Sequence, residues 1–233
     1  MQLRVLVYNV HGFQNGLGGV ALVVEHVRPD VALLNETGSR RSLRRFAKGM
    51  HMQAASDPWS PLARRVKDAV LVRSPWRIFE HRQHRFSGTD RMYPRGVLLA
   101  HIGRAGQPAW VASVHLGLRP VDRLANAKEL AALVRGLGEP VVIGGDCNEL
   151  PDGRAIGFLS ERFWDAWLLG GDVAGETFPA SDPLARIDYL FVSEGVRVAR
   201  VLVPGGELVR AASDHRPVVA ELTLPERRAP ERT

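Results

Sequence analysis

Cysteine is nearly absent from this chain of 233 residues. Cys147 is the only one, so no internal disulfide can form, and a reducing cytoplasm is the expected location. Long apolar runs are also lacking, because no stretch approaches the roughly 18 consecutive apolar residues of a membrane span. The first residues lack the layout of a signal peptide, since LRVLVYNV is typical of a strand. These absences favour a soluble cytoplasmic protein with no transmembrane segment.

Lysine is scarce too, although the net charge is +6. Apart from Lys48, Lys67 and Lys128, the basic side chains that make up this charge are arginines. Such a charge would attract polyanions, for example nucleic acid or anionic lipid headgroups. The alternative is an arginine bias set by genome composition. The charge therefore permits a nucleic-acid partner without indicating one.

Several signatures of enzyme chemistry are missing from the sequence. It contains no Cys/His cluster of the kind that zinc prefers, no G-x-S-x-G nucleophile motif and no P-loop. Their absence disfavours a covalent intermediate on a serine or cysteine. Any catalytic chemistry is expected to use other residue types.

The chain is expected to consist mainly of strands with a few helices between them. β-Branched and apolar runs bounded by Gly, Pro or polar residues predict strands over 3–10, 30–37, 68–74, 77–86, 95–103, 108–116, 140–145, 186–193, 196–203 and 216–224. Helical spacing and helix-end residues predict helices over 18–27, 40–49 and 120–136. No long linker or repeat divides the chain. A single domain of two sheets packed face to face, with helices outside, accounts for the number of strands.

Polar side chains of a few types stand at the ends of many predicted strands. A single residue of this kind is ordinarily a turn or cap residue, since turns favour Asp and Asn. Chance turn chemistry does not readily explain a set made only of Asn, Asp, Glu and His. Its members are Asn9, Glu36, His115, Asp146, Asn148, Asp188, Asp214 and His215.

The residue types in this set suit a metal-assisted reaction. Carboxylate and amide oxygens are hard ligands for Mg²⁺ or Mn²⁺. Histidines can stabilise or protonate phosphoryl oxygens, and a neighbouring carboxylate can orient one of them. Because no nucleophile motif is present, the set favours attack by activated water.

The order of the motifs resembles that of the endonuclease/exonuclease/phosphatase superfamily. The matching pieces are VYNVHG, LLNET, DAVLVRS, RGVLLAHI, SVHLGLRPVDRLANAKEL, VVIGGDCNELPD, RIDYLFVS and SDHRPVVAEL, and they span about residues 3 to 224. The resemblance implies an α/β fold, a four-layer αββα sandwich of two packed, mostly antiparallel sheets with helices outside. It also implies one catalytic domain over 1–224. The polar tail, 225–233, is expected to be disordered.

The resemblance implies a role for each residue of the acid and amide group. Glu36 looks like the main metal ligand, with Asn9 supporting the metal and Asp214 binding it or lying beside it. Asp146 would position or deprotonate the attacking water. Asn148 would hold that water and the phosphate in place.

The resemblance also implies roles for the two histidines. His215, oriented by Asp188, would stabilise the charge on the phosphorane or protonate the leaving oxygen. His115 would contact a phosphoryl oxygen. Tyr93 and Arg95 lie near matched motifs and are expected to line the substrate cleft.

Two positions depart from the family's pattern, and one discriminates among its branches. Cys147 stands where members commonly have a bulky residue, and we expect a buried apolar side chain there rather than a nucleophile. Asn35 replaces a glutamine that many members carry before the glutamate, and its role is open. His115, in VHLGL, resembles the branches with a histidine in this motif rather than exonuclease III-like repair enzymes.

The sequence therefore predicts a phosphoester hydrolase of the phosphodiesterase or nuclease type, with Mg²⁺ as the metal and Mn²⁺ as a second option. Its partner would be a phosphoester substrate, with nucleic acid as one candidate, and no obligate protein partner is evident. Two alternatives stay open. One is a phosphomonoesterase acting on a small phosphorylated metabolite or a lipid headgroup. The other is a non-catalytic member of the fold that binds nucleic acid or a partner.

Overall fold

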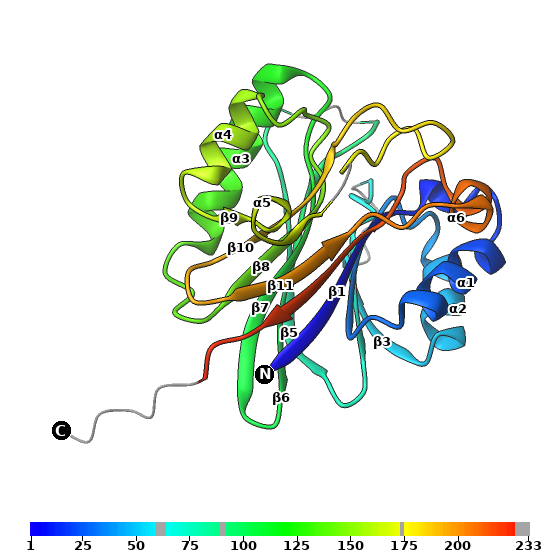
Figure 1. The fold of residues 1–233 in the computed structure, drawn as a ribbon, viewed down its shortest axis with the longest axis horizontal. Coiled ribbons are helices and arrows are strands. Elements are labelled where there is room, and N and C mark those ends of the chain that lie inside the picture. Colours follow the sequence, from blue (N-terminus) through cyan, green and yellow to red (C-terminus); the bar gives the residue numbers. More distant parts are fainter. Residues whose placement is uncertain (59–63, 89–91, 173–174, 227–233) are drawn as a thin grey trace.

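Two β-sheets packed face to face occupy the centre of the molecule, and helices cover the outer face of each (Figure 1). This computed structural model describes residues 1–58, 64–88, 92–172 and 175–226, and within them each sheet has six strands. The layers follow the order helix, sheet, sheet, helix. The four-layer αββα arrangement predicted from the sequence is therefore confirmed.

The first sheet is built around the N-terminal strand. Its order is β11 (Arg197–Leu202), β12 (Val218–Thr223), β1 (Gln2–Asn9), β2 (Val31–Asn35), β4 (Ala69–Arg73) and β3 (Met52–Ser56). β1 and β2 run parallel, and the other neighbours run antiparallel. All of β2 is buried, because helices cover one face of this strand and the second sheet covers the other. This double burial explains its uninterrupted apolar run.

The second sheet repeats this pattern of pairing. Its order is β5 (Arg77–Arg85), β6 (Gly96–Arg104), β7 (Gln107–His115), β8 (Val141–Asp146), β10 (Asp188–Val192) and β9 (Trp164–Asp165). Only β7 and β8 run parallel among these described neighbours. β5 is an edge strand with mostly exposed residues, and its arginines and histidines suit a position that faces water. The two sheets are thus mostly antiparallel, as predicted.

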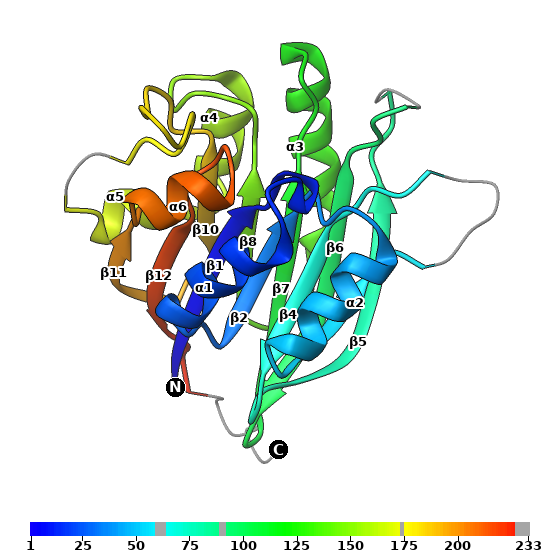
Figure 2. The ribbon, with the colours of Figure 1, turned by 90° about the vertical axis from the view of Figure 1, so that its right-hand side faces the viewer.

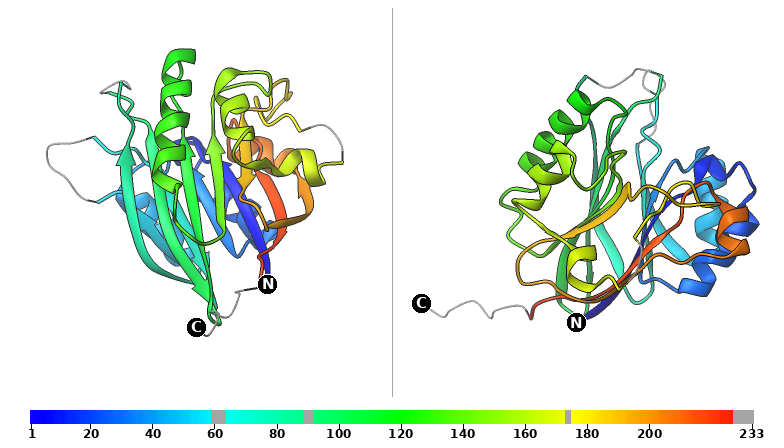
Figure 3. Two further views of the ribbon diagram at one scale, coloured as in Figure 1. Left: turned by 90° about the vertical axis from the view of Figure 1, so that its left-hand side faces the viewer. Right: turned by 45° about the horizontal axis from the view of Figure 1, so that its top comes forward.

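Helices cover the outer face of each sheet. The first sheet carries α1 (Leu17–Val27), α2 (Arg40–Gly49) and α6 (Glu207–Ala212), which Figure 2 shows in front of its strands. The second sheet carries α3 (Pro120–Val134) and α4 (Arg154–Ser160), which pack against each other (Figure 3). α5 (Ala166–Gly170) packs on β10 and β11, and a short 3-10 helix, His11–Phe13, follows β1. Pro120 begins α3 at its first turn, where its missing N–H costs nothing.

Three layers of buried apolar side chains hold these elements together. The central layer lies between the sheets and includes Val7, Leu33, Leu98 and Val142. One outer layer joins the first sheet to α1, α2 and α6. The other joins the second sheet to α3 and α4 and includes Cys147. Alternate residues of a strand enter different layers because their side chains point to opposite faces.

Every strand and helix predicted from the sequence is present. Among the described residues, six further elements were not predicted: β3, β9, α4, α5, α6 and the 3-10 helix His11–Phe13. β3 has the sequence MQAAS, which carries no β-branched residue and forms a strand only because β4 pairs with it. The other five have two to seven residues and are too short for a reliable period.

The predicted disordered tail falls mostly outside the described residues. Pro225 and Glu226 are described, and the carbonyl of Pro225 accepts a hydrogen bond from the Gln107 side chain. Residues 227–233 lie outside the part of the chain that the structure describes. Within the described part, none of the helices is both long enough and apolar enough to cross a membrane.

Candidate active site

The predicted site residues meet at one end of the two sheets because of how the strands run. The carboxyl ends of parallel neighbours share one edge, and ligands of such sheets commonly bind there. His115, Asp146 and Asp188 are direct register partners across β7, β8 and β10. Asn9 ends β1 and faces the same end from the other sheet. The two sheets therefore bring their polar strand ends together.

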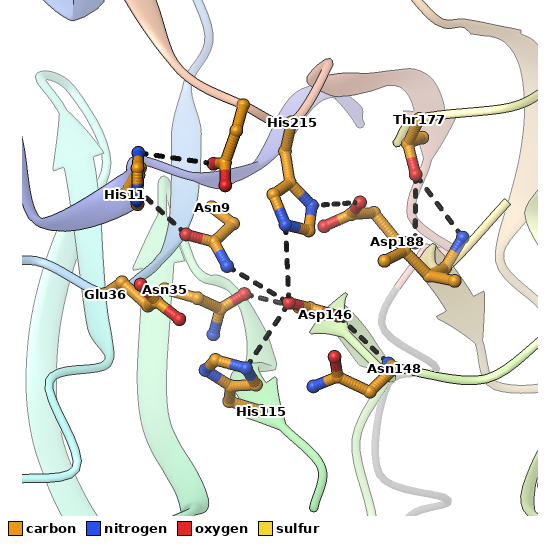
Figure 4. A network of polar contacts seen from close by, with 12 residues as sticks. Asn9, His11, Asn35, Glu36, His115, Asp146, Asn148, Thr177, Asp188 and His215 are labelled. Carbon is orange, nitrogen blue, oxygen red and sulfur yellow. Dashed lines mark hydrogen bonds and ion pairs between the residues drawn. The ribbon is translucent and has the colours of Figure 1, made fainter. Parts of the chain in front are cut away.

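Asp146 lies at the centre of this group, with an exposed fraction of 2% (Figure 4). Its Oδ2 accepts a hydrogen bond from Asn9 Nδ2 at 3.0 Å, and its Oδ1 accepts one from the Asn148 N–H at 2.9 Å. Nε2 of His115 and Nε2 of His215 lie 3.3 Å and 3.8 Å from Oδ2. Four predicted site residues thus surround one carboxylate.

The pKa of Asp146 lies well below its ordinary range. Burial by itself would raise that pKa, since it disfavours the charged form. His115, His215 and the Asn148 N–H together outweigh burial and stabilise the carboxylate. Asp146 is therefore ionised at neutral pH despite its burial.

His215 forms a buried pair with Asp188. Its Nδ1 donates to Asp188 Oδ2 at 2.8 Å, and its ring packs against Phe178 with centroids 4.9 Å apart. Burial lowers the pKa of His215, but Asp188 reverses this effect and the net pKa rises to about 10. The pKa of Asp188 is also raised, chiefly by its burial. The pair consequently keeps a shared proton at neutral pH.

His115 has a different partner behind its ring. Arg95 Nη1 lies 3.1 Å from His115 Nδ1. A guanidinium can only donate, so Nδ1 accepts and the ring proton is on Nε2. That Nε2 lacks a hydrogen bond of good geometry among the described residues, although Asp146 is near. Its N–H is thus a buried donor that faces the centre of the site.

Glu36 follows β2 at the edge of the network, opposite Asp188 (Figure 4). Its φ of 53° is in the left-handed region, which an ordinary side chain adopts at a cost that surrounding contacts must offset. The Glu36 carbonyl accepts the Gly12 N–H at 2.8 Å and so holds that turn. The Glu36 carboxylate lies 3.8 Å from Arg95 Nη1. Arg95 thus links Glu36 to His115.

Asp214 joins the network through His11. Its Oδ1 lies 3.6 Å from His11 Nδ1, and the His11 N–H donates to Asn9 Oδ1 at 3.0 Å. Ser213 donates its hydroxyl to the Asn9 carbonyl at 2.7 Å and so fastens this loop to β1. The side chain of Asp214 is 41% exposed, which makes it the most accessible carboxylate beside the site's core.

One cluster of side chains in the described part of the chain brings possible ligand atoms for a divalent ion close together. Asp146, Asp188 and His215 present ligand atoms within 4.8 Å of one another, and all three are buried. However, the Nδ1 of His215 is already bonded to Asp188. Glu36 and Asp214, the ligands predicted from the sequence, are 34% and 41% exposed and take no part in that bond. The donor chemistry of Glu36, Asp214 and the Asn9 amide oxygen fits Mg²⁺.

The three residues that follow Asp146 differ from one another in their roles. Cys147 is fully buried, and burial raises the pKa of its thiol well above the ordinary value, so it is no nucleophile. Asn148 has a φ of 51° and donates its side-chain amide to the Leu116 carbonyl at 3.1 Å. Glu149 is structural, since its carboxylate accepts the Ala155 N–H in the first turn of α4 at 2.7 Å and the Arg123 Nε–H at 3.0 Å.

Tyr93 and Arg95 both line a cavity of about 330 Å³ beside His115. Leu118, Arg119 and Asp122 form its other walls, and Tyr93 is 67% exposed. Larger cavities of about 550 and 440 Å³ occur in the described part of the chain, but they contain none of the predicted site residues. The small cavity adjoins the polar network through Arg95, which also contacts His115, whereas Tyr93 makes no hydrogen bond to that network within the described residues.

Three supporting residues were not found from the sequence. Thr177 accepts the N–H groups of Ile187 and Asp188, both at 3.3 Å, and so fixes the start of β10. Ser213 belongs to the SDH motif, so the sequence did contain a signal for its supporting role. Asp68 opens the predicted strand DAVLVRS, yet its contact with Asn35 depends on tertiary structure. Thr177 had no signal, because it lies in a segment without regular periodicity.

The comparisons with known proteins show the family and the fold. A model of the Endonuclease/Exonuclease/phosphatase family matches residues 6–215. The chain belongs to this family. No curated protein matches the sequence. The branch suggested by the histidine in VHLGL stays a prediction.

Three solved structures are similar to this chain over nearly their whole length. An endonuclease/exonuclease/phosphatase from Bacteroides vulgatus has a TM-score of 0.84 at 16% identity, covering 96% of this chain and 99% of that one. A mannosyl-6-phosphatase from Bacteroides thetaiotaomicron has 0.78 at 20%, covering 95% and 99%. The TDP2 of D. rerio, complexed with a single-strand DNA product, has 0.75 at 19%, covering 95% and 99%. At these identities the likeness shows the fold alone.

Proposed function

We propose that this chain is a Mg²⁺-dependent phosphoester hydrolase of the phosphodiesterase or nuclease type, in which activated water attacks phosphorus. The observation that carries the proposal is one buried, ionised carboxylate, Asp146, with two histidines beside it. Such an arrangement presents an acceptor for water next to donors for phosphoryl oxygens. Membership of a family of phosphoesterases supports the same reaction class.

Asp146 acts on the attacking water. Its lowered pKa keeps it ionised, so it accepts a hydrogen bond from water at any physiological pH. A carboxylate with a low pKa is a weak base, and it therefore orients the water more than it retains the proton. Asn148 and Asn9 hold the carboxylate oxygens in place through their bonds to it. Orienting the reacting atoms well can lower an activation barrier by on the order of 7 kcal/mol or more.

The two histidines bind the charge that develops on phosphorus. His215 is an imidazolium at neutral pH, held in orientation by Asp188, and it stabilises the phosphorane or donates to the leaving oxygen. His115 is a neutral donor through its Nε2–H and contacts a phosphoryl oxygen. The two rings thus supply one charged and one neutral donor to the same centre.

Glu36, Asp214 and Asn9 would hold the metal ion. A Mg²⁺ ion held there would neutralise charge on the phosphoryl oxygens. Glu36 is the main candidate ligand, because its carboxylate is accessible and has only a long contact to Arg95. Mn²⁺ would suit the same oxygen donors.

The cavity lined by Tyr93 and Arg95 would receive part of the substrate. Its volume of about 330 Å³ matches one small group, such as a sugar or a nucleoside, better than a long polymer. This observation favours, as a second candidate function, hydrolysis of a phosphomonoester of a small metabolite or lipid headgroup. The mannosyl-6-phosphatase and the TDP2 structure represent the two substrate classes among proteins of the fold. A catalytic domain over 1–224 and a cytoplasmic location belong to the same proposal.

A panel of phosphoesters tests the function. Purified protein is assayed with Mg²⁺ on single- and double-stranded DNA, RNA, sugar phosphates, inositol phosphates and sphingomyelin. We expect turnover of at least one class, its loss in EDTA and its return with Mg²⁺ or Mn²⁺. Glu36→Gln should raise the Mg²⁺ concentration needed for half-maximal rate. Asp57→Asn is the matched control, because Asp57 is a buried carboxylate paired with Arg65 and lies outside the network.

The outcomes separate the candidate functions. Full activity in excess chelator would remove the metal from the mechanism. Turnover of monoesters alone would select the phosphomonoesterase. Nucleic-acid binding with no turnover of any ester would identify the non-catalytic alternative.

A further inference from the structure

Gly144 lets the two sheets approach each other closely, and Gly145 lets β8 lie close to its neighbour β7. A Cβ on Gly144 would lie 2.4 Å from Val7 Cγ2 and 2.9 Å from Leu33 Cδ1, both in the first sheet. A Cβ on Gly145 would lie 1.7 Å from the Val114 carbonyl oxygen. Side chains are therefore excluded at both positions. Just before Asp146, a group from the first sheet can reach the backbone of the second.

Asn35 is the side chain that crosses this interface. It ends β2 and is fully buried. Its Oδ1 accepts the backbone N–H of Asp146 at 3.0 Å, while its Nδ2 donates to the Val114 carbonyl at 3.0 Å. Both strands of the second sheet that carry His115 and Asp146 are thus bonded to one amide of the first. The amide's oxygen and nitrogen are both used.

Asp68 and Ser113 hold the Asn35 amide in this orientation. Asp68, at the start of β4, accepts from Nδ2 at 2.9 Å. Ser113 Oγ lies 3.4 Å from Nδ2 and donates to the Leu34 carbonyl at 3.0 Å. Asp68 is fully buried, and burial raises the pKa of its carboxyl well above the ordinary value. A neutral acid still offers an acceptor oxygen to the amide.

We propose that Asn35, oriented by Asp68, is a positioning residue that fixes the backbone of Asp146 and thereby the carboxylate that faces the attacking water. This rests on the role proposed for Asp146. Removal of the amide leaves the Asp146 N–H buried without a partner and frees the strand end to shift. A displacement of about 1 Å at a reacting group costs on the order of 10²-fold in rate. This proposal gives a role to Asn35, which the sequence alone left open.

The other end of β8 provides a matched control. There the Val141 N–H donates to Ser193 Oγ at 2.9 Å, as the Asp146 N–H donates to Asn35. Ser193→Ala thus removes a side-chain acceptor from the same strand, far from the polar network. A purely structural role for Asn35 predicts that both substitutions reduce stability and leave kcat of the folded enzyme unchanged.

The test combines kinetics with amide exchange. For Asn35→Leu we expect kcat to fall on the order of 10²-fold with KM little changed, and the Asp146 amide to exchange faster with solvent deuterium. Ser193→Ala should leave kcat and the Asp146 amide as in wild type. Asp68→Asn keeps an acceptor of the same size and should retain most of kcat, whereas Asp68→Leu should lose on the order of tenfold.

Each outcome bears on the proposal. A kcat loss in Asn35→Leu no larger than in Ser193→Ala, or an unchanged Asp146 exchange rate, would overturn it. If Asn35→Leu does not fold, Asp68→Leu supplies the same comparison, because it leaves the Asn35 acceptor and removes its support. If the wild type hydrolyses no phosphoester, the exchange measurement still decides whether Asn35 holds Asp146, and the failure belongs to the proposed function.

Discussion

His115 and His215 lie beside the same carboxylate, that of Asp146. The Nδ1 of one ring faces a positively charged side chain, and the Nδ1 of the other faces a negatively charged one. Nδ1 of His215 donates to Asp188, and Nδ1 of His115 accepts from Arg95. His215 is stabilised as an imidazolium, whereas Nδ1 of His115 accepts a hydrogen bond from Arg95 and its Nε2–H faces the site. The group that is hydrogen-bonded to Nδ1 thus decides which form of the ring presents its Nε2 to the site. Two identical side chains become different reagents.

The largest effect is expected when Asp146, the carboxylate that both histidine rings face, loses its charge. Asp146→Asn keeps the size of the side chain and removes its charge, so kcat should fall on the order of 10³-fold while KM changes little. Asn148→Ala should cost less, on the order of 10²-fold, since it removes positioning and leaves the acceptor. Steady-state kinetics on the best substrate measure both. An Asp146→Asn enzyme of near wild-type rate would make this strand end a simple turn.

The next effect concerns the charged histidine. His215→Ala should lower kcat on the order of 10²-fold or more. Asp188→Asn should lose much of the same rate, and the double mutant should be little worse than His215→Ala, because groups that act as a unit are not additive. The double-mutant cycle measures this coupling. Losses that multiply would show that the two residues act independently.

Removal of the Arg95 guanidinium should change the tautomer of His115. Arg95→Met removes the donor to Nδ1, so we expect the His115 ring to lose its fixed tautomer and kcat to fall about tenfold. Nitrogen NMR shifts of the ring report the tautomer directly. Arg119→Met is the control, since Arg119 lines the same cavity and donates hydrogen bonds to Asp122 and to the Gly88 carbonyl. An unchanged ring spectrum in Arg95→Met would remove the contrast between the histidines.

The smallest effect is a pH dependence of stability in EDTA. The pKa of His215 is raised from 6.5 to about 10 in the folded state, so the folded protein keeps a proton that the unfolded chain releases. This contribution is fully present below about pH 6.5 and is lost as the pH rises towards 10. Denaturant unfolding should show the advantage of wild type over His215→Gln shrinking across that range. Asp188→Asn should flatten the same dependence, because Asp188 is the main cause of the raised pKa.

Strand positions were predictable because apolar runs carry a period that local sequence preserves. All ten predicted strands exist, and β2 shows why its run was unbroken: both of its faces are buried. β3 and α4 to α6 escaped prediction because short elements depend on their neighbours more than on their own propensity. The site residues could be selected by their types at strand ends. Thr177 and Asp68 could not, since their partners lie 10 to 33 positions away along the chain.

The sequence by itself determined which residues stand at strand ends, that they are acids, amides and histidines, and that the motifs follow one family's order. Tertiary structure alone decided which nitrogen of each histidine meets which charge. It also decided that Asn35 crosses between the sheets and that Asp68 supports it. The physical reason is that side-chain pairing depends on strand register and on the distance between the sheets. Contacts between residues 79 to 137 positions apart, such as Asn35 with Val114 and Asn9 with Asp146, leave no local pattern in the chain.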